Sequence, residues 1–310
     1  MGNRARTPST RRAVPIGTKR ERRSVRAPDY DGWSIGIYTG VSPLNLMDSS
    51  KIRNPVLSRR NVSDVRAAFV ADPFMIKANG SWSMFFEVMN SKSDKGEIGF
   101  AISADGFRWD YQQIVLDEPF HLSYPYVFQW RRSYYMIPET LARSAVCLYK
   151  ADPFPMRWKL VKRLIEGECA DPSIFRFQNR WWMFVCARPY QHDMLRLFFA
   201  DKLLGPWVEH PRSPIIRRNK RKARPGGRVL EVDGRVIRFT QDCYPIYGSA
   251  VRAFEITELS PTCYRERESA GSPILGGSGR GWNRFGMHTI DAHPISKDRW
   301  IACVDGVANK

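Results

Sequence analysis

Acidic side chains recur where short apolar stretches of this sequence begin or end, and residues of this type at this spacing could support acid–base chemistry. The residues concerned are Asp72, Glu87, Glu139, Asp171, Asp291 and Asp305. Carboxyl groups held close together are driven to different pKa values, so that one stays protonated while another is ionised. Glycosidic chemistry requires such a pair of carboxyl groups.

The acids belong to a pattern that repeats along the chain. In its first three copies, the last residue of an apolar stretch lies 14 positions after a proline. These pairs are Pro73 and Glu87, Pro125 and Glu139, and Pro172 and Cys186. Two weaker copies begin at Arg224 and Asp291. Each copy alternates β-rich stretches with turn residues, which is typical of a β-hairpin.

The length of the repeat predicts the fold. Successive copies are spaced by about 50 residues, the length of one four-stranded propeller blade. Five copies therefore predict an all-β, five-bladed β-propeller over residues 29–310, preceded by a disordered basic tail at residues 1–28. A β-sandwich with chance repeats is the alternative.

A propeller would bring the repeated positions together. The first strand of each blade lines the central channel, and the first residues of these strands are Asp72, Tyr124, Asp171, Arg224 and Asp291. The second strand returns beside the first, and the last residues of the second strands are Glu87, Glu139, Cys186, Thr240 and Asp305. We therefore expect six carboxylates at one channel mouth. Separately, each Asp could instead start a turn or cap a loop.

We expect this mouth to hold a sugar. Asp72 is the candidate base or nucleophile and Glu139 the candidate general acid. The full catalytic set is Asp72, Glu139 and Asp171, and the substrate-binding set is Glu87, Tyr124, Arg188, His192, His288 and Asp291. In these sets, Asp171 and Asp291 would hold sugar hydroxyls, and Tyr124 would offer a hydrogen bond or a stacking face. The arginine and the two histidines would bind an anionic part of the ligand.

The chain carries a formal net charge of +18, and most of the excess lies in two segments. Residues 1–28 hold nine basic residues against one acid, and residues 217–224 hold six basic residues. Such runs are solvated charge or interaction segments, so we expect weak attraction to anionic surfaces. Nucleic-acid binding is an alternative that rests on charge, since aromatic residues do not alternate with the basic ones, and we expect no specific nucleic acid.

Several further features narrow the class of protein. No stretch approaches the roughly 18 consecutive apolar residues of a membrane-spanning helix, and no apolar signal segment follows the basic N-terminus. The six cysteines form no Cys-x-x-Cys pair, so we expect no zinc site and no structural disulfide. We therefore expect a cytoplasmic protein that needs no metal or other cofactor.

Several longer motifs resemble one known family. They lie at residues 33–38, 54–57, 69–74, 85–90, 116–125, 137–140 and 300–306. These motifs are similar to the N-terminal domain of plant glucosamine inositolphosphorylceramide transferase and its bacterial stand-alone relatives, over roughly residues 30–307. The resemblance implies a five-bladed propeller related to the arabinanase, levansucrase and invertase superfamily.

The same resemblance implies roles for single residues. The superfamily uses an Asp of the first blade as nucleophile or base, an Asp of the second as stabiliser, and a Glu as general acid. Asp72 matches the first position, Tyr124 stands at the second, and Glu139 or Glu87 would be the acid. In the plant protein, sugar transfer is assigned to a separate C-terminal glycosyltransferase module.

Taken together, these features predict a carbohydrate-active propeller that binds or processes a glycan or glycolipid head group in glycoconjugate biosynthesis. A non-catalytic glycan-binding module that partners a separate glycosyltransferase is the first alternative.

Overall fold

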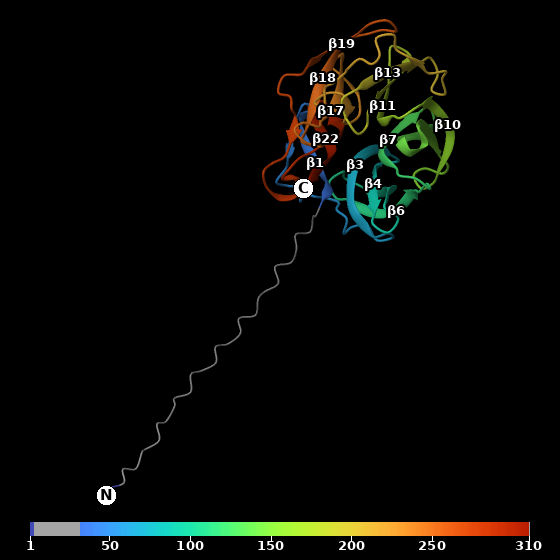
Figure 1. Ribbon diagram of the computed structural model, residues 1–310. Coiled ribbons are helices and arrows are strands. Elements are labelled where there is room, and N and C mark those ends of the chain that lie inside the picture. Colours follow the sequence, from blue (N-terminus) through green and yellow to red (C-terminus); the bar gives the residue numbers. More distant parts are fainter. Residues whose placement is uncertain (3–31, 310) are drawn as a thin grey trace.

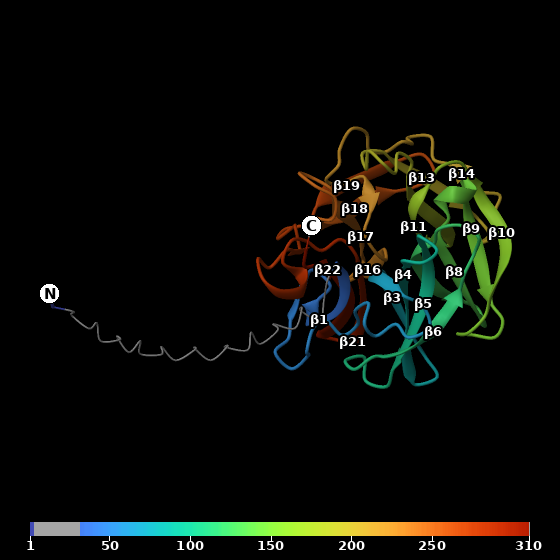
Figure 2. The ribbon, with the colours of Figure 1, turned by 60° about the horizontal axis from the view of Figure 1, so that its bottom comes forward.

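The computed structural model describes residues 1–2 and 32–309, so the expected tail at residues 1–28 lies, apart from residues 1–2, outside the described residues. The described chain folds into five antiparallel sheets arranged in a ring, which confirms the all-β, five-bladed β-propeller (Figure 1). Figure 2 shows the ring turned by 60°, with the sheets again standing around a common centre. Helical structure in the described residues is limited to two short 3-10 turns, η1 (Leu141–Arg143) and η2 (Gly281–Asn283).

The first three blades each contain four strands, numbered from the channel outward. Blade 1 consists of β3 (Ala67–Ala78), β4 (Ser81–Asn90), β5 (Lys95–Ser103) and β6 (Asp110–Leu116). Blade 2 consists of β7 (Ser123–Trp130), β8 (Ser133–Glu139), β9 (Ala145–Ala151) and β10 (Trp158–Glu166). Blade 3 consists of β11 (Ala170–Phe177), β12 (Arg180–Cys186), β13 (Leu195–Ala200) and β14 (Val208–Glu209).

The last two blades depart from this simple order. Blade 4 has an interrupted inner edge, and its strands are β15 (Arg224–Pro225), β16 (Leu230–Val232), β17 (Arg235–Asp242), β18 (Ala250–Leu259), β19 (Tyr264–Glu268) and β20 (Leu275–Gly276). Blade 5 combines both ends of the described chain in the order β21 (Ile290–Ser296), β22 (Arg299–Val307), β1 (Trp33–Ser42) and β2 (Asn45–Asp48). Pairing between β1 and β22 closes the ring.

The inner strands of the first three blades carry the same local distortion. Asp72, Tyr124 and Asp171 have φ angles of 53°, 46° and 50°, and the pairing register shifts at each of them. Each residue precedes a proline, which disfavours the right-handed helical region. The left-handed conformation costs a non-glycine residue about 1–2 kcal/mol, so the surrounding packing must hold it. A bulge re-aims its side chain, and the three bulges lie at one end of the channel, which we call the mouth.

Large side chains fill the spaces between neighbouring blades. The ring of Phe74 in β3 lies edge-on to Tyr124 in β7, with ring centres 4.8 Å apart. Trp130 at the end of β7 meets Trp181 of β12 at 5.0 Å. Such aromatic pairs add to the burial of apolar surface that holds blade against blade. Among the described residues, no helix is long and apolar enough to cross a membrane.

A segment of blade 4 crosses the channel between β15 and β16. Gly227 forms a parallel bridge with Ile290 of blade 5. The φ of Gly227 is 154°, and a Cβ there would lie 1.9 Å from the carbonyl oxygen of Ile290. Glycine is therefore required for this close approach.

Arg228, the residue after Gly227, contacts three further blades. Arg228 Nε donates to Asp291 Oδ1 of blade 5 at 2.6 Å, and its Nη2 donates to the carbonyl of Val127 in blade 2 at 2.9 Å. Its guanidinium also lies 5.9 Å from the ring centre of Phe74 in blade 1. One arginine of the fourth blade thus contacts the first, second and fifth blades beneath the mouth.

Candidate functional site

The structure brings five of the six predicted carboxylates together at the mouth. These are Asp72, Glu87, Glu139, Asp171 and Asp305. The backbone N–H of Asp171 donates to Glu139 Oε2 at 3.2 Å, and that of Asp72 donates to Asp305 Oδ2 at 3.0 Å. Carboxylates from blades 1, 2, 3 and 5 therefore meet in one place, as the repeat predicted.

Asp291 lies deeper in the channel than the other five acids. Its Oδ2 accepts a hydrogen bond at 2.7 Å from the backbone of Met75, three residues beyond Asp72 in β3. Burial alone would raise the pKa of Asp291, but the adjacent Arg228 and His293 lower it to about 2. Asp291 is a fully enclosed partner of Arg228 and not part of the mouth cluster. Its role in holding a sugar stays a prediction, which this placement does not favour.

An imidazole ring links two of the mouth carboxylates. His288 Nδ1 lies 2.8 Å from Asp305 Oδ1, and its Nε2 lies 3.4 Å from Asp72 Oδ1. Burial would lower the pKa of His288, but the charges of Asp305 and Asp72 outweigh burial and raise it. Thr289 Oγ1 also donates to Asp72 Oδ1 at 2.7 Å, and Trp33 stacks on the imidazole at 4.0 Å. Thr289 and His288 thus both contact the same carboxylate oxygen of Asp72, Oδ1.

The same three residues have the spacing of a metal site. One ligand atom from each of Asp72, His288 and Asp305 lies within 4.8 Å of the others. However, Asp305 Oδ1 already accepts hydrogen bonds from the backbone of His288 and Thr289 and contacts the imidazole. Its Oδ2 accepts from the backbone of Asp72. Because protein donors occupy both Asp305 oxygens, we describe the group as a hydrogen-bonded relay and assign it no metal.

Arg224, the first residue of β15, neutralises part of the cluster. Its guanidinium forms an ion pair with Asp171 and lies 3.5 Å from Glu139 Oε2. Gln241 Nε2 donates to Asp171 Oδ2 at 2.7 Å. Asp171 is 1% exposed, and both of its carboxylate oxygens accept hydrogen bonds from these side chains.

The three side chains expected to bind an anion are placed differently. The guanidinium of Arg188 lies 3.4 Å from Asp193 at the rim of the mouth. Burial, followed by the charge of Arg224, lowers the pKa of His192 to about 4, so its ring is neutral at pH 7. His288 is enclosed between two carboxylates. Their role in anion binding stays a prediction, and this geometry does not favour it.

Three carboxyl groups keep an edge open to solvent. Asp72, Glu87 and Glu139 are 5%, 6% and 6% exposed, in contrast to the fully enclosed Asp305. Burial is the main cause that raises the pKa of Asp72 to about 6. Burial, reinforced by the neighbouring acids, raises the pKa values of Glu87 and Glu139 well above their usual range. Asp72 therefore loses its proton more readily than the two glutamic acids do.

Several site residues, among them His121, Gln241 and Thr289, were not predicted as such from the sequence. His121, in the loop before β7, places Nε2 3.4 Å from Glu87 Oε1. Its Nδ1 accepts a hydrogen bond from the backbone of Gly96 at 2.9 Å, and burial lowers the pKa of His121. The neutral ring therefore carries its proton on Nε2 and donates toward Glu87. In the sequence, the signal that could have identified His121 is its position within the motif at residues 116–125.

Tyr124 lies beneath the cluster and is fully buried. Its hydroxyl is 2.9 Å from Ser173 Oγ and donates to the carbonyl of Gly227 at 3.3 Å. The ring consequently offers no stacking face at the mouth, and its binding role stays a prediction that this burial does not favour.

We predict that Tyr124→Phe lowers the free energy of unfolding by about 0.5–1.5 kcal/mol, the net worth of a hydrogen bond. Sugar binding at the mouth should be unchanged, because the hydroxyl is used inside the fold. Urea unfolding and a binding titration on the same preparation check both parts. A loss of binding without a loss of stability would restore Tyr124 as a ligand residue.

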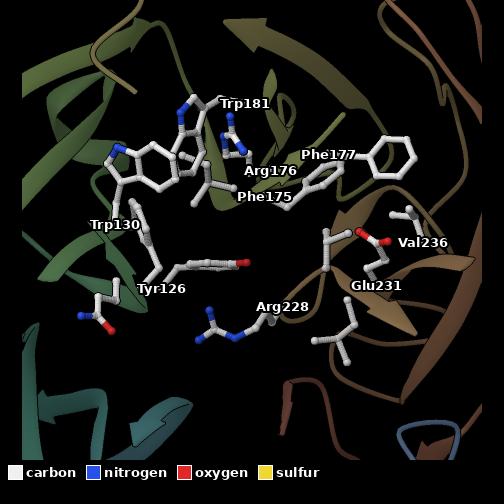
Figure 3. A pocket seen from close by; sticks show the side chains of 14 residues that line it. Tyr126, Trp130, Phe175, Arg176, Phe177, Trp181, Arg228, Glu231 and Val236 are labelled. Carbon is white, nitrogen blue, oxygen red and sulfur yellow. The ribbon is translucent and has the colours of Figure 1, made fainter. Parts of the chain in front are cut away.

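A cavity of about 240 Å³ opens at the far end of the channel. Figure 3 shows Tyr126 and Glu231 on opposite sides of it, with Arg228 between them. The guanidinium of Arg176 lies 5.0 Å from the ring centre of Trp130, so a protein side chain already covers this indole. The clustered carboxylates lie at the mouth, and the chemistry therefore favours the mouth over this cavity.

Comparison with known proteins identifies the family that this sequence matches and its relatives. The family described as "Glucosamine inositolphosphorylceramide transferase 1, N-terminal" matches residues 26–307. Glucosamine inositolphosphorylceramide transferase 1 of Oryza sativa subsp. japonica is 35% identical over 302 residues, covering 90% of this chain and 40% of the rice protein. The Arabidopsis thaliana protein of the same name is 32% identical, covering 91% of this chain and 40% of its own length. The chain thus spans about 40% of the curated relatives that it matches.

Solved structures share the fold at low sequence identity. A glycosyl hydrolase from Bacteroides ovatus superimposes with a TM-score of 0.60 at 10% identity, covering 83% of this chain and 92% of that protein. A family 117 glycoside hydrolase from Zobellia galactanivorans gives a TM-score of 0.53 at 13% identity, covering 89% of this chain and 90% of that protein. These likenesses show the propeller architecture.

Proposed function

Because the chain belongs to the family of the glucosamine inositolphosphorylceramide transferase 1 N-terminal domain, we propose that its channel mouth binds the glycan of a glycolipid head group. The name of the relatives describes a transferase that acts with inositolphosphorylceramide. The chain spans about 40% of the length of these relatives. We assign the propeller recognition of the sugar, and we propose a glycosyltransferase as the partner that performs transfer.

The observation that carries this proposal is the set of three carboxyl groups with open edges. Within the described residues, Asp72 Oδ2 and Glu139 Oε1 accept no hydrogen bond, while Glu87 contacts His121 through one oxygen. An ionised carboxylate accepts hydrogen bonds from sugar hydroxyls, and a protonated carboxyl also donates one. The hydroxyls of a sugar would supply partners for these groups.

Glycoside processing by the same residues is the second candidate, and the order of the pKa values favours it. Burial raises the pKa of Asp72 to about 6 and, together with the neighbouring acids, raises the pKa of Glu139 well above its usual range, so Asp72 loses its proton before Glu139 does. The mouth thus contains a base beside an acid, as glycosidic bond cleavage or transfer requires.

The test compares Asp72→Asn and Glu139→Gln with the parent protein. The probe is the set of head-group glycans released from inositol-phosphate glycolipids, titrated calorimetrically at pH 7. Each substitution keeps the size of the side chain but removes its charge or proton, and we expect about 5- to 150-fold weaker binding, equivalent to 1–3 kcal/mol. The matched control is Glu231→Gln, an exposed acid at the far-end cavity, which should bind like the parent.

Two outcomes would contradict the proposal. Full binding by both mouth variants, with parent-like unfolding curves, would make the cluster structural. Equal loss in the Glu231→Gln control would move the site to the far end. Product analysis on the same samples then separates the candidates: catalysis predicts parent turnover that falls about 100-fold or more in Asp72→Asn.

A further inference from the structure

The basic run at residues 217–222 lies at the rim of the mouth. Ile216, just before it, bridges Leu195 at the mouth end of β13. The carbonyl of Lys220 accepts a hydrogen bond from the backbone of Cys243 at 2.9 Å, and that of Arg221 accepts one from Thr240 Oγ1 at 3.2 Å. Blade 4 therefore holds the run beside the last residues of β17.

Much of the charge on this run is not neutralised. In the part of the chain that the structure describes, Arg217, Arg218 and Lys220 are exposed and form no ion pair. Arg221 pairs with Asp242 at 3.2 Å and lies 4.6 Å from the ring centre of Tyr244. A hollow of about 400 Å³ opens here, lined by Asp193, Arg218, Asn219, Lys220, Arg221 and Tyr244.

Exposed aromatic and aliphatic side chains lie in the loops that follow β12 and β17, and one of them, Tyr244, lines the hollow. Tyr190, Tyr244 and Ile246 are 76%, 54% and 42% exposed. Tyr190 follows Pro189, whose carbonyl accepts a hydrogen bond from Arg224 at the mouth. We call Tyr190, Arg217, Arg218, Lys220, Tyr244 and Ile246 the rim patch. Tyrosine beside unpaired arginine and lysine is the composition that favours a membrane–water interface.

We propose that the rim patch docks the protein on a bilayer surface rich in anionic lipid, with the channel mouth turned toward the head groups. The orientation of the mouth toward the membrane rests on the proposed function. In this orientation a glycolipid head group can reach Asp72 and Glu139 while its lipid stays in the membrane. Ile246 and the tyrosines enter the head-group region, while Arg218 and Lys220 meet lipid phosphates. A soluble polyanion such as a nucleic acid would use the charges but gain less from an exposed isoleucine.

Co-sedimentation of the full chain with vesicles tests the charge. We compare phosphatidylcholine vesicles with vesicles that also contain 30% phosphatidylserine, a chosen composition, at about 0.1 M salt. The double variant Arg218→Gln, Lys220→Gln should bind roughly 30-fold more weakly, since each basic residue near the surface contributes about 1 kcal/mol. The control, Arg132→Gln with Lys297→Gln, removes two exposed charges from turns at the far end and should bind like the parent.

A second variant separates a bilayer from a soluble polyanion. Tyr244→Ser with Ile246→Ser should weaken vesicle binding and leave binding to a single-stranded oligonucleotide or heparin unchanged. The proposal is overturned if anionic lipid does not improve binding, if the far-end control loses as much as the rim variant, or if the oligonucleotide binds as tightly as vesicles. Because these vesicles contain no glycolipid, Asp72→Asn should dock like the parent even if the sugar site is refuted.

Discussion

Replacing Arg228 by methionine should lower the free energy of unfolding by about 3–5 kcal/mol, the range for breaking one side of a buried ion pair. Asp291 is fully enclosed, and its carboxylate oxygens are 2.6 and 3.2 Å from the guanidinium. Methionine replaces the aliphatic stem of the arginine but leaves this charge without its main partner. The guanidinium also packs 4.8 Å from the ring centre of Tyr126, so blade-to-blade contact is lost with the charge. Urea unfolding at pH 7 measures the change.

Two controls make this result specific to the channel. Adding Asp291→Asn to the methionine variant removes the stranded charge and should recover part of the loss. Arg267→Met breaks an exposed pair with Glu255 at 2.9 Å and should cost less than about 1 kcal/mol. If Arg228→Met lowered the free energy of unfolding by no more than Arg267→Met does, the contacts of Arg228 across the channel would not be holding the blades together.

The hairpin repeat predicted most of the architecture because each copy encodes a local structure. An apolar stretch, a turn and a second apolar stretch specify a hairpin without reference to the rest of the chain, and the spacing between copies specifies the blade. The repeat also predicted the approach of Asp72, Glu139 and Asp171, since a closed ring must bring equivalent positions together. The cytoplasmic location and the disordered tail stay predictions.

The fifth copy was misread for a physical reason. In the first three copies the key residue directly precedes proline and sits in a bulge, whereas Asp291 precedes Pro294 by three positions. Asp291 therefore pairs in regular register opposite Cys303 and points below the mouth. At mouth level the fifth blade instead presents His288, together with Asp305 from its second strand.

Other contacts could not be predicted because they depend on ring closure. Trp33 reaches His288 once β1 has paired with β22, and the two residues are distant in sequence. Arg228 meets Asp291 because blade 4 interrupts its inner strand at Gly227 and crosses the channel. Neither interaction follows from local propensity, so pattern analysis of one sequence does not reveal them.

We expect Glu87→Gln to stabilise the protein at pH 8 by about 1–3 kcal/mol, the range for relieving a buried and poorly partnered polar group. Burial and four neighbouring acids raise the pKa of Glu87 well above its usual range, and its contact in the described residues is His121 at 3.4 Å. A raised folded-state pKa means that the stabilising, protonated form is fully present below pH 4.5. That stability is lost as pH rises through the folded-state value.

The parent should therefore be less stable at pH 8 than at pH 5, and glutamine, which does not titrate, should reduce that difference. At pH 5 the variant and the parent should unfold at nearly the same urea concentration. Some dependence on pH should remain, because the pKa of His288 is also raised and its charged form is likewise lost at high pH. Asp72, whose pKa is raised to about 6, contributes in the same direction.

Glu266→Gln provides the contrasting control. The side chain of Glu266 is also buried, which by itself would raise its pKa. The guanidinium of Arg238, 2.5 Å from the carboxylate, outweighs burial and lowers that pKa. This substitution should destabilise the protein at pH 8, where the ion pair is intact. If Glu87→Gln behaved in the same way, Glu87 would be a structural ion-pair partner. The opposite sign would show that the fold keeps an acid at the mouth against its own stability, which is expected of a group retained for ligand chemistry.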